Sequence, residues 1–361
     1  MNKKYIAIIA SAVAAVIAGA YACSSTRNYH KIIVVTGATP LALKQDADKN
    51  ISLEVSGNTK KIYKFDEESI NAFASVYIRT REVDSKGELE GTYRYTGVQV
   101  LNIIEGIAPE KPKDALFDRP LDMVVTFISS SGKQSHFSYG ELTMTDDVKP
   151  VILAYHRTEL VSSKSTPEKP YTLNKHKGEL TGLRLICPGD NDTARYLDDV
   201  TKIIIREIPV DNTEFPLMTK GFRCVADSVK TVHNGRVLPL NLNGVETAST
   251  QNWFRTGHGQ GFKGVSSASG YNLRSLLRKN FPGAGEDNYF LFVACDGYRT
   301  LFSGREIFNT AAGKSMMMLS EMDGRKTRGG MSLGPVSDYY VDRETWGLTH
   351  IMMIDNVQDI K

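Results

Sequence analysis

The apolar and polar positions after about residue 50 follow the same order twice along the chain. Gly97 begins a block in which apolar residues recur at helical spacing as far as Ile104, and Gly270 begins a matching block that runs to Leu277, at an offset of 173 residues. Apolar residues three and four positions apart share one face of a helix, so each block predicts a turn followed by a short amphipathic helix. Self-similarity at a fixed offset indicates an internal repeat.

A second pair of blocks predicts a β-hairpin in each copy. The run 124–128 is followed by a glycine and a second apolar run, and the run 290–294 begins the same series of features, in which the glycine and the second run recur at an offset of 165. Many of these residues are β-branched or aromatic, and the glycine between the runs is typical of a tight turn between two strands. The apolar runs 151–154 and 316–319 keep the same offset.

The last pair of blocks, 182–205 and 330–353, is related by an offset of 148. Offsets that change only between blocks are what loop insertions produce, because loops tolerate changes of length better than packed strands do. The Pro-bearing stretch 209–216 predicts a linker between the copies. We therefore expect a first domain over 46–210 and a second over 211–361, in agreement with the usual size of about 100–200 residues per domain.

Residues 1–23 have the composition of an export signal. Two lysines precede an apolar run from Tyr5 to Ala22, which ends in small residues just before Cys23. The residues around Cys23 resemble the lipobox of bacterial lipoproteins, and this resemblance implies that Cys23 carries the lipid. The alternative is an uncleaved signal anchor, because about 18 apolar residues can just span a bilayer core.

Residues 24–45 follow this signal and predict a short tether. Either reading of the N-terminus holds the rest of the chain outside the cytoplasm, attached to a membrane. By resemblance to lipoprotein sorting, the absence of Asp after Cys23 favours the outer membrane, on its periplasmic or surface face. The predicted localisation is thus the cell envelope.

Charge and cysteine content exclude several classes of function. Lys and Arg total 44 against 41 acidic residues, and a net charge of +3 gives no strong attraction to nucleic acid. The chain has no CxxC motif, which argues against c-type haem, thioredoxin-like chemistry and cysteine-rich zinc sites. Besides Cys23 it contains Cys187, whose context is that of a core residue, and Cys224 and Cys295, whose pairing the sequence leaves open.

Each copy resembles the molybdopterin-binding domain of the sulfite-oxidase family. The first copy carries Leu153-Ala154-Tyr155 and the block Gly182-Leu183-Arg184-Leu185-Ile186-Cys187-Pro188-Gly189, and the second carries Asp296-Gly297-Tyr298-Arg299. The resemblance covers roughly 50–210 and 225–355. It implies an α+β fold of two tandem molybdopterin-binding-like domains with irregular mixed sheets.

The resemblance also implies where a metal would bind. In catalytic members a cysteine upstream of the Gly-x-x-Leu helix ligates molybdenum as a thiolate, a soft ligand suited to a transition metal. The corresponding stretches here, 75–80 and 252–256, contain no cysteine. We therefore expect no metal ligand in either copy, and no histidine spacing suggests another metal site.

Four residues are candidates for holding a cofactor or anion. Arg184 and Arg299 lie in the family blocks, and a guanidinium can bind a phosphate or oxyanion through paired hydrogen bonds. Arg255 and His258 lie in a Gly-rich stretch that would let the backbone approach a ligand closely. Structural ion pairs and a solvated surface loop are the alternatives for these residues. No catalytic residue can be named.

The sequence therefore predicts an exported, membrane-tethered lipoprotein that reuses this domain as a divergent, non-catalytic binding or assembly module. No cofactor is expected, although molybdopterin stays open. The alternative is a periplasmic molybdopterin-dependent oxidoreductase of the sulfite-oxidase type. The expected partners are the membrane, through the N-terminus, and an envelope protein or a small anionic ligand, with no nucleic acid.

Overall fold

Alternating buried and exposed positions mark the β-strands, which hold 48% of the described residues. The computed structural model describes residues 51–145, 150–161, 172–174, 180–208, 210, 215, 224–257 and 261–355, all of them within the unit Gln45–Lys361. The predicted export signal, Cys23, the tether and His258 lie outside these residues. Among the residues described, no helix is long and apolar enough to cross a bilayer.

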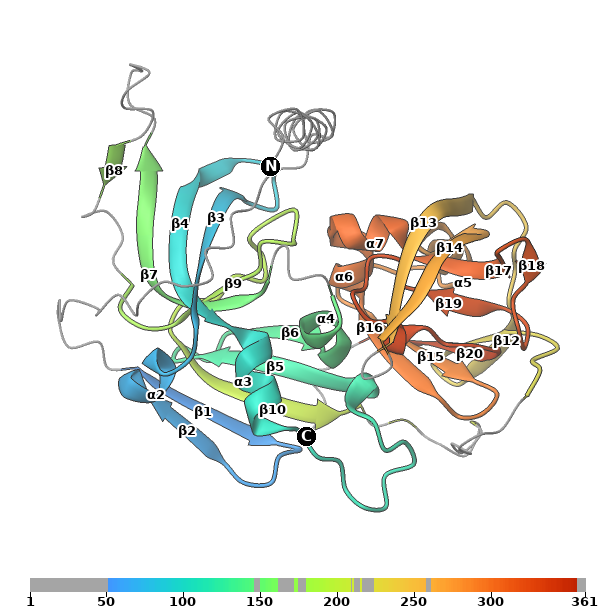
Figure 1. Cartoon of the computed structure of the whole chain (residues 1–361), viewed down its shortest axis with the longest axis horizontal. Coiled ribbons are helices and arrows are strands. Elements are labelled where there is room, and N and C mark those ends of the chain that lie inside the picture. Colours follow the sequence, from blue (N-terminus) through green and yellow to red (C-terminus); the bar gives the residue numbers. More distant parts are fainter. Residues whose placement is uncertain are drawn as a thin grey trace, which may run out of the picture. The chain divides into compact units, whose positions relative to one another are not determined.

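Two five-stranded sheets form the first half, defined here as residues 51–208 (Figure 1). One has the order β2 (Tyr63–Asp66), β1 (Ser52–Gly57), β10 (Val200–Glu207), β5 (Met123–Ser129) and β6 (Gln134–Ser138). The other has the order β3 (Ser75–Val83), β4 (Leu89–Gln99), β7 (Ile152–Val161) and β8 (Thr172–Asn174), and β9 (Arg184–Ile186) also pairs with β7.

The second half, residues 224–355, repeats both sheets with the same strand order. Its first sheet runs β12 (Arg236–Pro239), β11 (Lys230–His233), β20 (Leu348–Ile354), β15 (Tyr289–Ala294) and β16 (Arg299–Ser303). Its second runs β13 (Thr247–Gly257), β14 (Gly261–Asn272), β17 (Met317–Met322) and β18 (Arg325–Lys326), with β19 (Ser332–Gly334) paired to β17. The predicted hairpins are confirmed, because β5 pairs antiparallel with β6 and β15 with β16.

Helices are short in both halves. They are α2 (Glu67–Asn71), α3 (Val100–Ile107), η1 (Pro120–Asp122) and α4 (Tyr139–Thr143) in the first half, and α5 (Leu273–Asn280), α6 (Gly304–Asn309), α7 (Ala311–Ser315) and η3 (Val341–Arg343) in the second. The helices predicted after Gly97 and Gly270 are confirmed as α3 and α5, which bury their apolar faces. Helix α3 ends where Ala108 adopts a left-handed conformation, with φ 51°.

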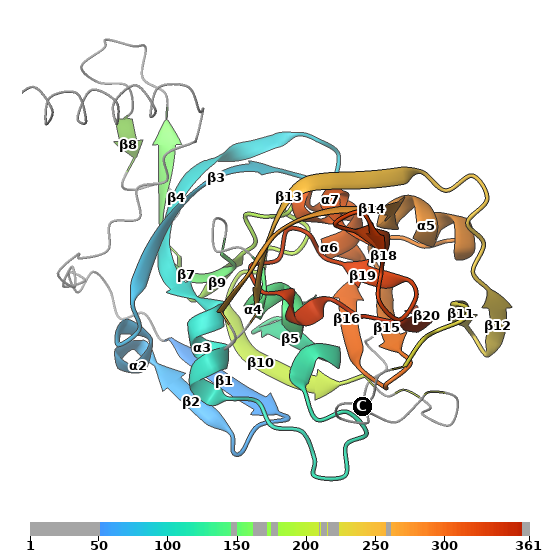
Figure 2. The same ribbon diagram turned by 45° about the vertical axis from the view of Figure 1, so that its right-hand side comes forward.

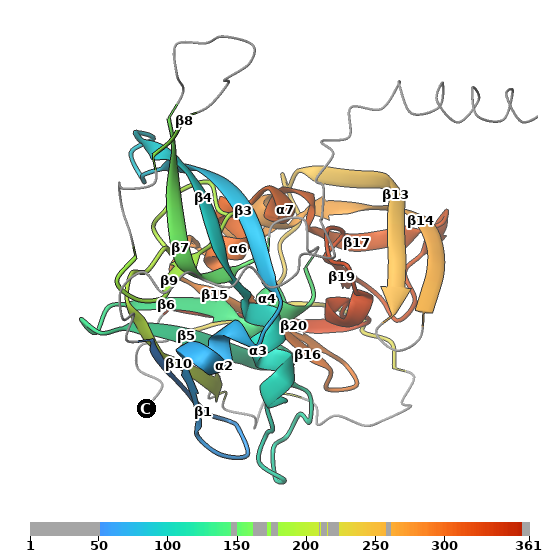
Figure 3. The same cartoon turned by 60° about the vertical axis from the view of Figure 1, so that its left-hand side comes forward.

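The α+β fold class predicted from the sequence is wrong, because the structure is mostly β. Of the described residues, 48% lie in strands and 16% in helices, and the strands form four small sheets. The physical reason is that each Gly-x-x-Leu block supports a helix of only eight residues. The Ser- and Gly-rich stretch 247–272 pairs with itself as the long β13–β14 ribbon (Figure 3).

Each half has its own apolar core, and a third cluster joins them. Val124 of β5 packs in one cluster with Tyr289, Leu291 and Val293 of β15 and with Leu301 of β16. Cys187 is buried in the core of the first half, as its apolar context predicts. Burying apolar side chains from both halves favours their association, at about 25 cal/mol for each Å² removed from water.

A reciprocal hydrogen-bonded contact also joins the halves, near α4 and β16 (Figure 1). The Ser138 hydroxyl donates to Glu306 of the second half (3.2 Å), and the Ser303 hydroxyl donates to Glu141 of the first half (2.8 Å). Each serine also caps the helix of its own half, since its Oγ accepts from the backbone N–H of the glutamate three residues on. The two halves thus exchange equivalent contacts.

A buried arginine lies beside each of these glutamates. Arg195 contacts Glu141 at 2.6 Å, and Arg343 contacts Glu306 at the same distance. Each arginine also forms two hydrogen bonds with an aspartate of its own half, Asp190 or Asp338. Arg343 is completely buried, lies over the Phe302 ring and packs against Gly140, where a Cβ would overlap it. Removal of any one of these three buried groups would leave the others without a partner, which is energetically costly.

Candidate ligand cavity in the second half

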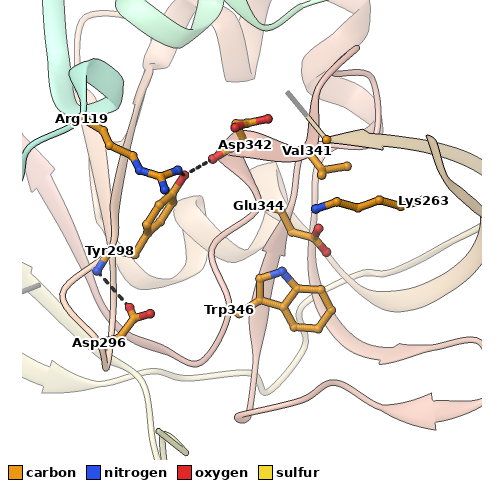
Figure 4. Close-up of a pocket in the computed structure, with 9 residues that line it drawn as sticks. Arg119, Lys263, Asp296, Tyr298, Val341, Asp342, Glu344 and Trp346 are labelled. Carbon is orange, nitrogen blue, oxygen red and sulfur yellow. Dashed lines mark hydrogen bonds between the residues drawn. The ribbon is translucent and has the colours of Figure 1, made fainter. Parts of the chain in front are cut away.

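A cavity of about 210 Å³ opens between three segments of the second half. It is bordered by the β13–β14 hairpin, the turn between β15 and β16, and the chain from η3 to Trp346, while Arg119 reaches it from the first half (Figure 4). Ligand pockets for drug-sized molecules are usually about 300–1,000 Å³, so this cavity is suited to a smaller ligand.

Glu344 lies on one wall of the cavity and is held by Arg255. The Arg255 Nη2 atom is 2.7 Å from Glu344 Oε2, and both side chains are largely buried. The Arg255 guanidinium also lies 5.3 Å from the ring centre of Trp253 and 5.7 Å from that of Trp346. These distances are those of cation–π contacts, which fix the arginine and therefore the carboxylate it holds.

The strand register explains why these side chains face inward. Trp253 is buried, Phe254 is exposed and Arg255 is again largely buried, which is the alternation of a strand with one face towards the core. A bulge follows, because Arg255 pairs with Gly264 but Thr256 pairs with Phe262. Lys263 is the extra residue, and the bulge lets its side chain turn into the cavity (Figure 4).

Glu344 is a buried carboxyl group with positive charges beside it. Burial raises the pKa of Glu344 above its ordinary value, and the nearby positive charges of Arg255 and Lys263 oppose this effect without cancelling it. A new positive charge in the cavity would add to their effect. Glu344 is therefore the side chain whose protonation would respond most directly to a bound cation.

Tyr298 forms the opposite wall. Its hydroxyl donates to the backbone carbonyl of Asp342 (2.5 Å) and accepts a hydrogen bond from Arg119 (3.4 Å), whose guanidinium lies 5.2 Å from the ring centre. The Tyr298 backbone N–H donates to Asp296, across a turn in which Gly297 has φ 82°. Burial raises the pKa of Tyr298 to about 12, so the phenol stays neutral.

Three acidic and two basic side chains line the cavity, and Arg255, which pairs with Glu344, adjoins it. Asp296, Asp342 and Glu344 line it together with two basic residues, Arg119 and Lys263. Tyr298 and Trp346 add aromatic surface. Carboxylates beside aromatic rings accept hydrogen bonds and attract positive charge, so this arrangement suits a ligand with a cationic or hydrogen-bond-donating group and an apolar part.

The structure separates the residues that the sequence singled out. Arg255 adjoins the cavity, whereas Arg184 lies in the first half and pairs with Asp198 (2.7 Å) and Glu82 (3.4 Å). Arg299 is buried in β16, where burial lowers the pKa of its guanidinium. His258 lies outside the described residues. That these residues hold an anion or cofactor stays a prediction, and Arg184 and Arg255 do not share one site.

Sequence reasoning missed most of the residues that form the cavity. Tyr298 and Asp296 were noticed only as part of a family block, and Lys263, Glu344 and Trp346 were not singled out. Glu344 lies 89 residues from Arg255 in the sequence, so no local spacing could reveal their pairing. The clearest available signal was Trp346 itself, since the chain has only two tryptophans and both lie at this site.

The donor set of the described residues does not fit a molybdopterin cofactor. The stretches expected to carry the metal-ligating cysteine lie on β3 and β13 without one. Cys295 is joined to Cys224 by a disulfide, which answers the question of their pairing, and burial raises the pKa of the Cys187 thiol well above its usual value. Within the described ranges, no three His, Cys, Asp or Glu side chains come together as metal ligands.

Comparisons with known proteins leave the family open. No family model and no curated protein matches the chain. Among solved structures, the chain is similar to the sulfane dehydrogenase SoxCD from Paracoccus pantotrophus, with 14% sequence identity and a TM-score of 0.31 over 87% of this chain and 79% of that one. A TM-score this low supports no inference about activity, so the function is argued from the cavity.

Proposed function

We propose that this chain is an exported, membrane-tethered binding protein whose second half holds a small ligand in the cavity beside Glu344. The observation that carries the proposal is a cavity of about 210 Å³ in which three carboxylates surround Tyr298 and Trp346. The ligand would carry a positively charged or hydrogen-bond-donating group next to an apolar part. The order of the sequence blocks supports a divergent, non-catalytic relative of the molybdopterin-binding domains.

Recognition would divide between the two kinds of side chain. The Trp346 and Tyr298 rings would contact the apolar part of the ligand and exclude water from it. Glu344 and Asp342 would accept hydrogen bonds from its positive group. Arg255 holds Glu344 in place before the ligand arrives, and a site organised in advance loses less entropy on binding.

Binding of a cation would also be coupled to a proton. Burial raises the pKa of Glu344, and a cation beside it would favour the charged carboxylate. The complex would then release a proton, so affinity would increase as the pH rises through the range in which free Glu344 titrates. The affinity of a neutral or anionic ligand would not increase with pH in this way.

The membrane tether is supported by the sequence. The apolar run 5–22, the small residues before Cys23 and the polar residues after it are those of a lipid-anchored export signal. Lipidation of Cys23 and a location on the outer membrane are parts of this proposal. Mass spectrometry of the mature chain would test them, since an N-terminal diacylglyceryl-cysteine would support lipidation and an intact residue 1 would contradict it.

Calorimetric titration of the full chain in detergent with benzylamine, benzyl alcohol and benzoate tests the proposed ligand class, because these probes share a ring and differ in charge. We expect benzylamine to bind at least about tenfold more tightly than benzoate, a difference of about 1.4 kcal/mol. We expect Trp346→Ala to weaken the binding of all three probes, and Glu344→Gln to abolish the preference for benzylamine.

Matched controls are provided by the equivalent positions of the first half, Tyr196 and Asp198. Tyr196→Phe and Asp198→Asn should leave the benzylamine affinity unchanged, because neither residue lines the cavity. Equal binding of benzylamine and benzoate, or a preference that Glu344→Gln leaves unchanged, would overturn the proposal.

A further inference from the structure

The outer face of the β13–β14 hairpin exposes large apolar side chains. Phe254 is 65% exposed, Phe262 66% and Val265 48%. Phe254 pairs with Val265 and Thr256 pairs with Phe262, so the three apolar side chains share one face of the ribbon. The opposite face carries Trp253, which is buried. We call Phe254, Phe262 and Val265 the outer apolar face.

The fold does not require this face to be apolar. The equivalent hairpin of the first half is β3–β4 (Figure 2), and its register puts Arg81 at the position of Phe254 and Thr92 at the position of Val265. Of these three equivalent positions, only that of Phe262 holds a large exposed apolar residue, Leu89, with 62% exposure; Tyr77, farther along β3, is 50% exposed. The same ribbon therefore exists with a more polar outer face, and the phenylalanines need another explanation.

We propose that the outer apolar face of β13–β14 rests on the lipid surface to which the N-terminus anchors the chain. Phenylalanine favours the boundary between headgroups and acyl chains, where its ring leaves water. Three side chains alone would bind a membrane weakly. Such a face becomes effective when a second signal already holds the protein at the membrane.

The length of the N-terminal segment is compatible with contact between the outer apolar face and the lipid surface. The apolar run ends at Ala22 and the described structure begins at Ile51. A segment of this length reaches at most about 100 Å when fully extended. The anchor would therefore hold the hairpin at a high effective concentration near the lipid surface, where a weak contact is populated.

This contact would also position the cavity. Gly257 and Lys263 belong to the same hairpin and line the cavity. Docking of the outer face would thus hold the cavity within about one strand's thickness of the lipid surface. The inference rests on the membrane tether in the proposed function, but it does not depend on the ligand of the cavity.

The test places a tryptophan on the outer face of the full chain, reconstituted into vesicles of phosphatidylethanolamine and phosphatidylglycerol. Phe262→Trp is a conservative change at an exposed site, and Leu89→Trp is its matched control in the first half. Lipids with brominated acyl chains quench tryptophans that touch them. We expect quenching of the added Phe262→Trp emission to exceed that of the Leu89→Trp emission at least twofold, after subtraction of the unmodified chain.

Two outcomes would overturn the proposal. Equal quenching of both variants would show that the outer apolar face does not contact lipid. Protection of the new tryptophan from both brominated lipid and aqueous iodide would show that protein covers the face instead. Co-sedimentation of the chain with the vesicles is measured separately, so failure of the tether is distinguished from failure of this contact.

Discussion

In the first half Glu82 forms an ion pair with Arg184, whereas at the equivalent position of the second half Arg255 forms an ion pair with Glu344. Glu82 and Arg255 occupy the same place in the ribbon, because each pairs with a glycine and precedes a bulge. The halves thus keep a buried pair at this place while inverting the sign contributed by the strand. The shared fold determines which strand position contributes to the pair, and it does not determine the sign of the charge at that position.

The contact between the halves has diverged much less. Ser138 and Glu141 in the first half match Ser303 and Glu306 in the second, and each serine donates to the glutamate of the other half. Such a reciprocal contact needs both copies at once, so a change on one side leaves a buried charge on the other. Interface residues are therefore constrained, while the cavity residues can vary.

The strongest way to break this comparison is to remove the interface arginine of one half. Arg343→Ala leaves Glu306 and Asp338 buried without their shared partner, and we expect a loss of about 3–5 kcal/mol in the free energy of unfolding. Arg195→Ala removes the equivalent contact of the first half and should cost a similar amount. Denaturant titration measures both.

Gly140→Ala disturbs the same contact from the first half, because a Cβ at Gly140 would overlap the Arg343 side chain. It should destabilise the chain without removing a charge. If Arg343→Ala cost less than about 1 kcal/mol, the contact would be no stronger than a surface ion pair, and the argument for its constraint would fail.

The disulfide is the next largest difference between the halves. Cys224 and Cys295 close a loop with a sequence separation of 71 in the second half, and Ser130 occupies the position equivalent to Cys295. We expect the double change to Ala to lower the stability of the second half by about 2–4 kcal/mol. Both tryptophans lie in the second half, so their fluorescence follows its unfolding selectively. Unchanged unfolding by this probe would contradict the expectation.

The acidity of Glu306 gives the interface a pH dependence. Burial raises the pKa of Glu306 from 4.5 to about 8, so between these values the folded chain holds a proton that the unfolded chain has released. Stability therefore falls as the pH rises through this window, by at most about 1.4 kcal/mol per unit for this group.

Unfolding measured from pH 6.5 to 8 in the wild type and in Glu306→Gln tests this expectation. The lower limit lies above the pKa of about 6 to which burial raises Asp338, so that group contributes little to the slope. The difference between the two proteins should shrink as the pH falls. Parallel curves would show that Glu306 is already charged in the folded state.

The sequence predicted the local elements of this comparison better than its chemistry. The blocks after Gly97 and Gly270 have apolar residues at helical spacing, and they form α3 and α5. The stretch 247–272 has no regular alternation of apolar and polar residues, because many of its residues are Ser and Gly. Its two faces are distinguished only in the structure, where Trp253 is buried and Phe254 is exposed. The sequence therefore did not reveal the β13–β14 hairpin, and this is why the α+β expectation failed.

The candidate site was predictable only in part, for a related reason. Arg255 stood out beside a tryptophan in a Gly-rich stretch, but its partner Glu344 is brought to it by the fold of distant segments. The bulge that turns Lys263 towards the cavity is a property of strand register. Neither feature has a sequence spacing that could reveal it.

Neutralising the two inverted pairs sharpens the comparison. Glu344→Gln and Glu82→Gln each keep an acceptor and remove a charge beside a buried arginine, and we expect each to cost about 1–2 kcal/mol in unfolding free energy. Only Glu344→Gln should also weaken benzylamine binding, because Glu82 is in the first half and does not line the cavity. Equal effects of both changes on binding would show that the acidity of the cavity wall is not what selects the ligand.

The smallest expected effect on stability concerns the outer apolar face. Phe262→Ser and its counterpart Leu89→Ser change side chains that are 66% and 62% exposed, so each should alter the free energy of unfolding by less than about 0.5 kcal/mol. If the phenylalanine is kept for lipid contact, Phe262→Ser should still weaken the protection of β13–β14 from hydrogen exchange on vesicles, and Leu89→Ser should not. A large loss of stability from Phe262→Ser would instead assign this residue to the core, and the two hairpins would then differ in packing rather than in what they touch.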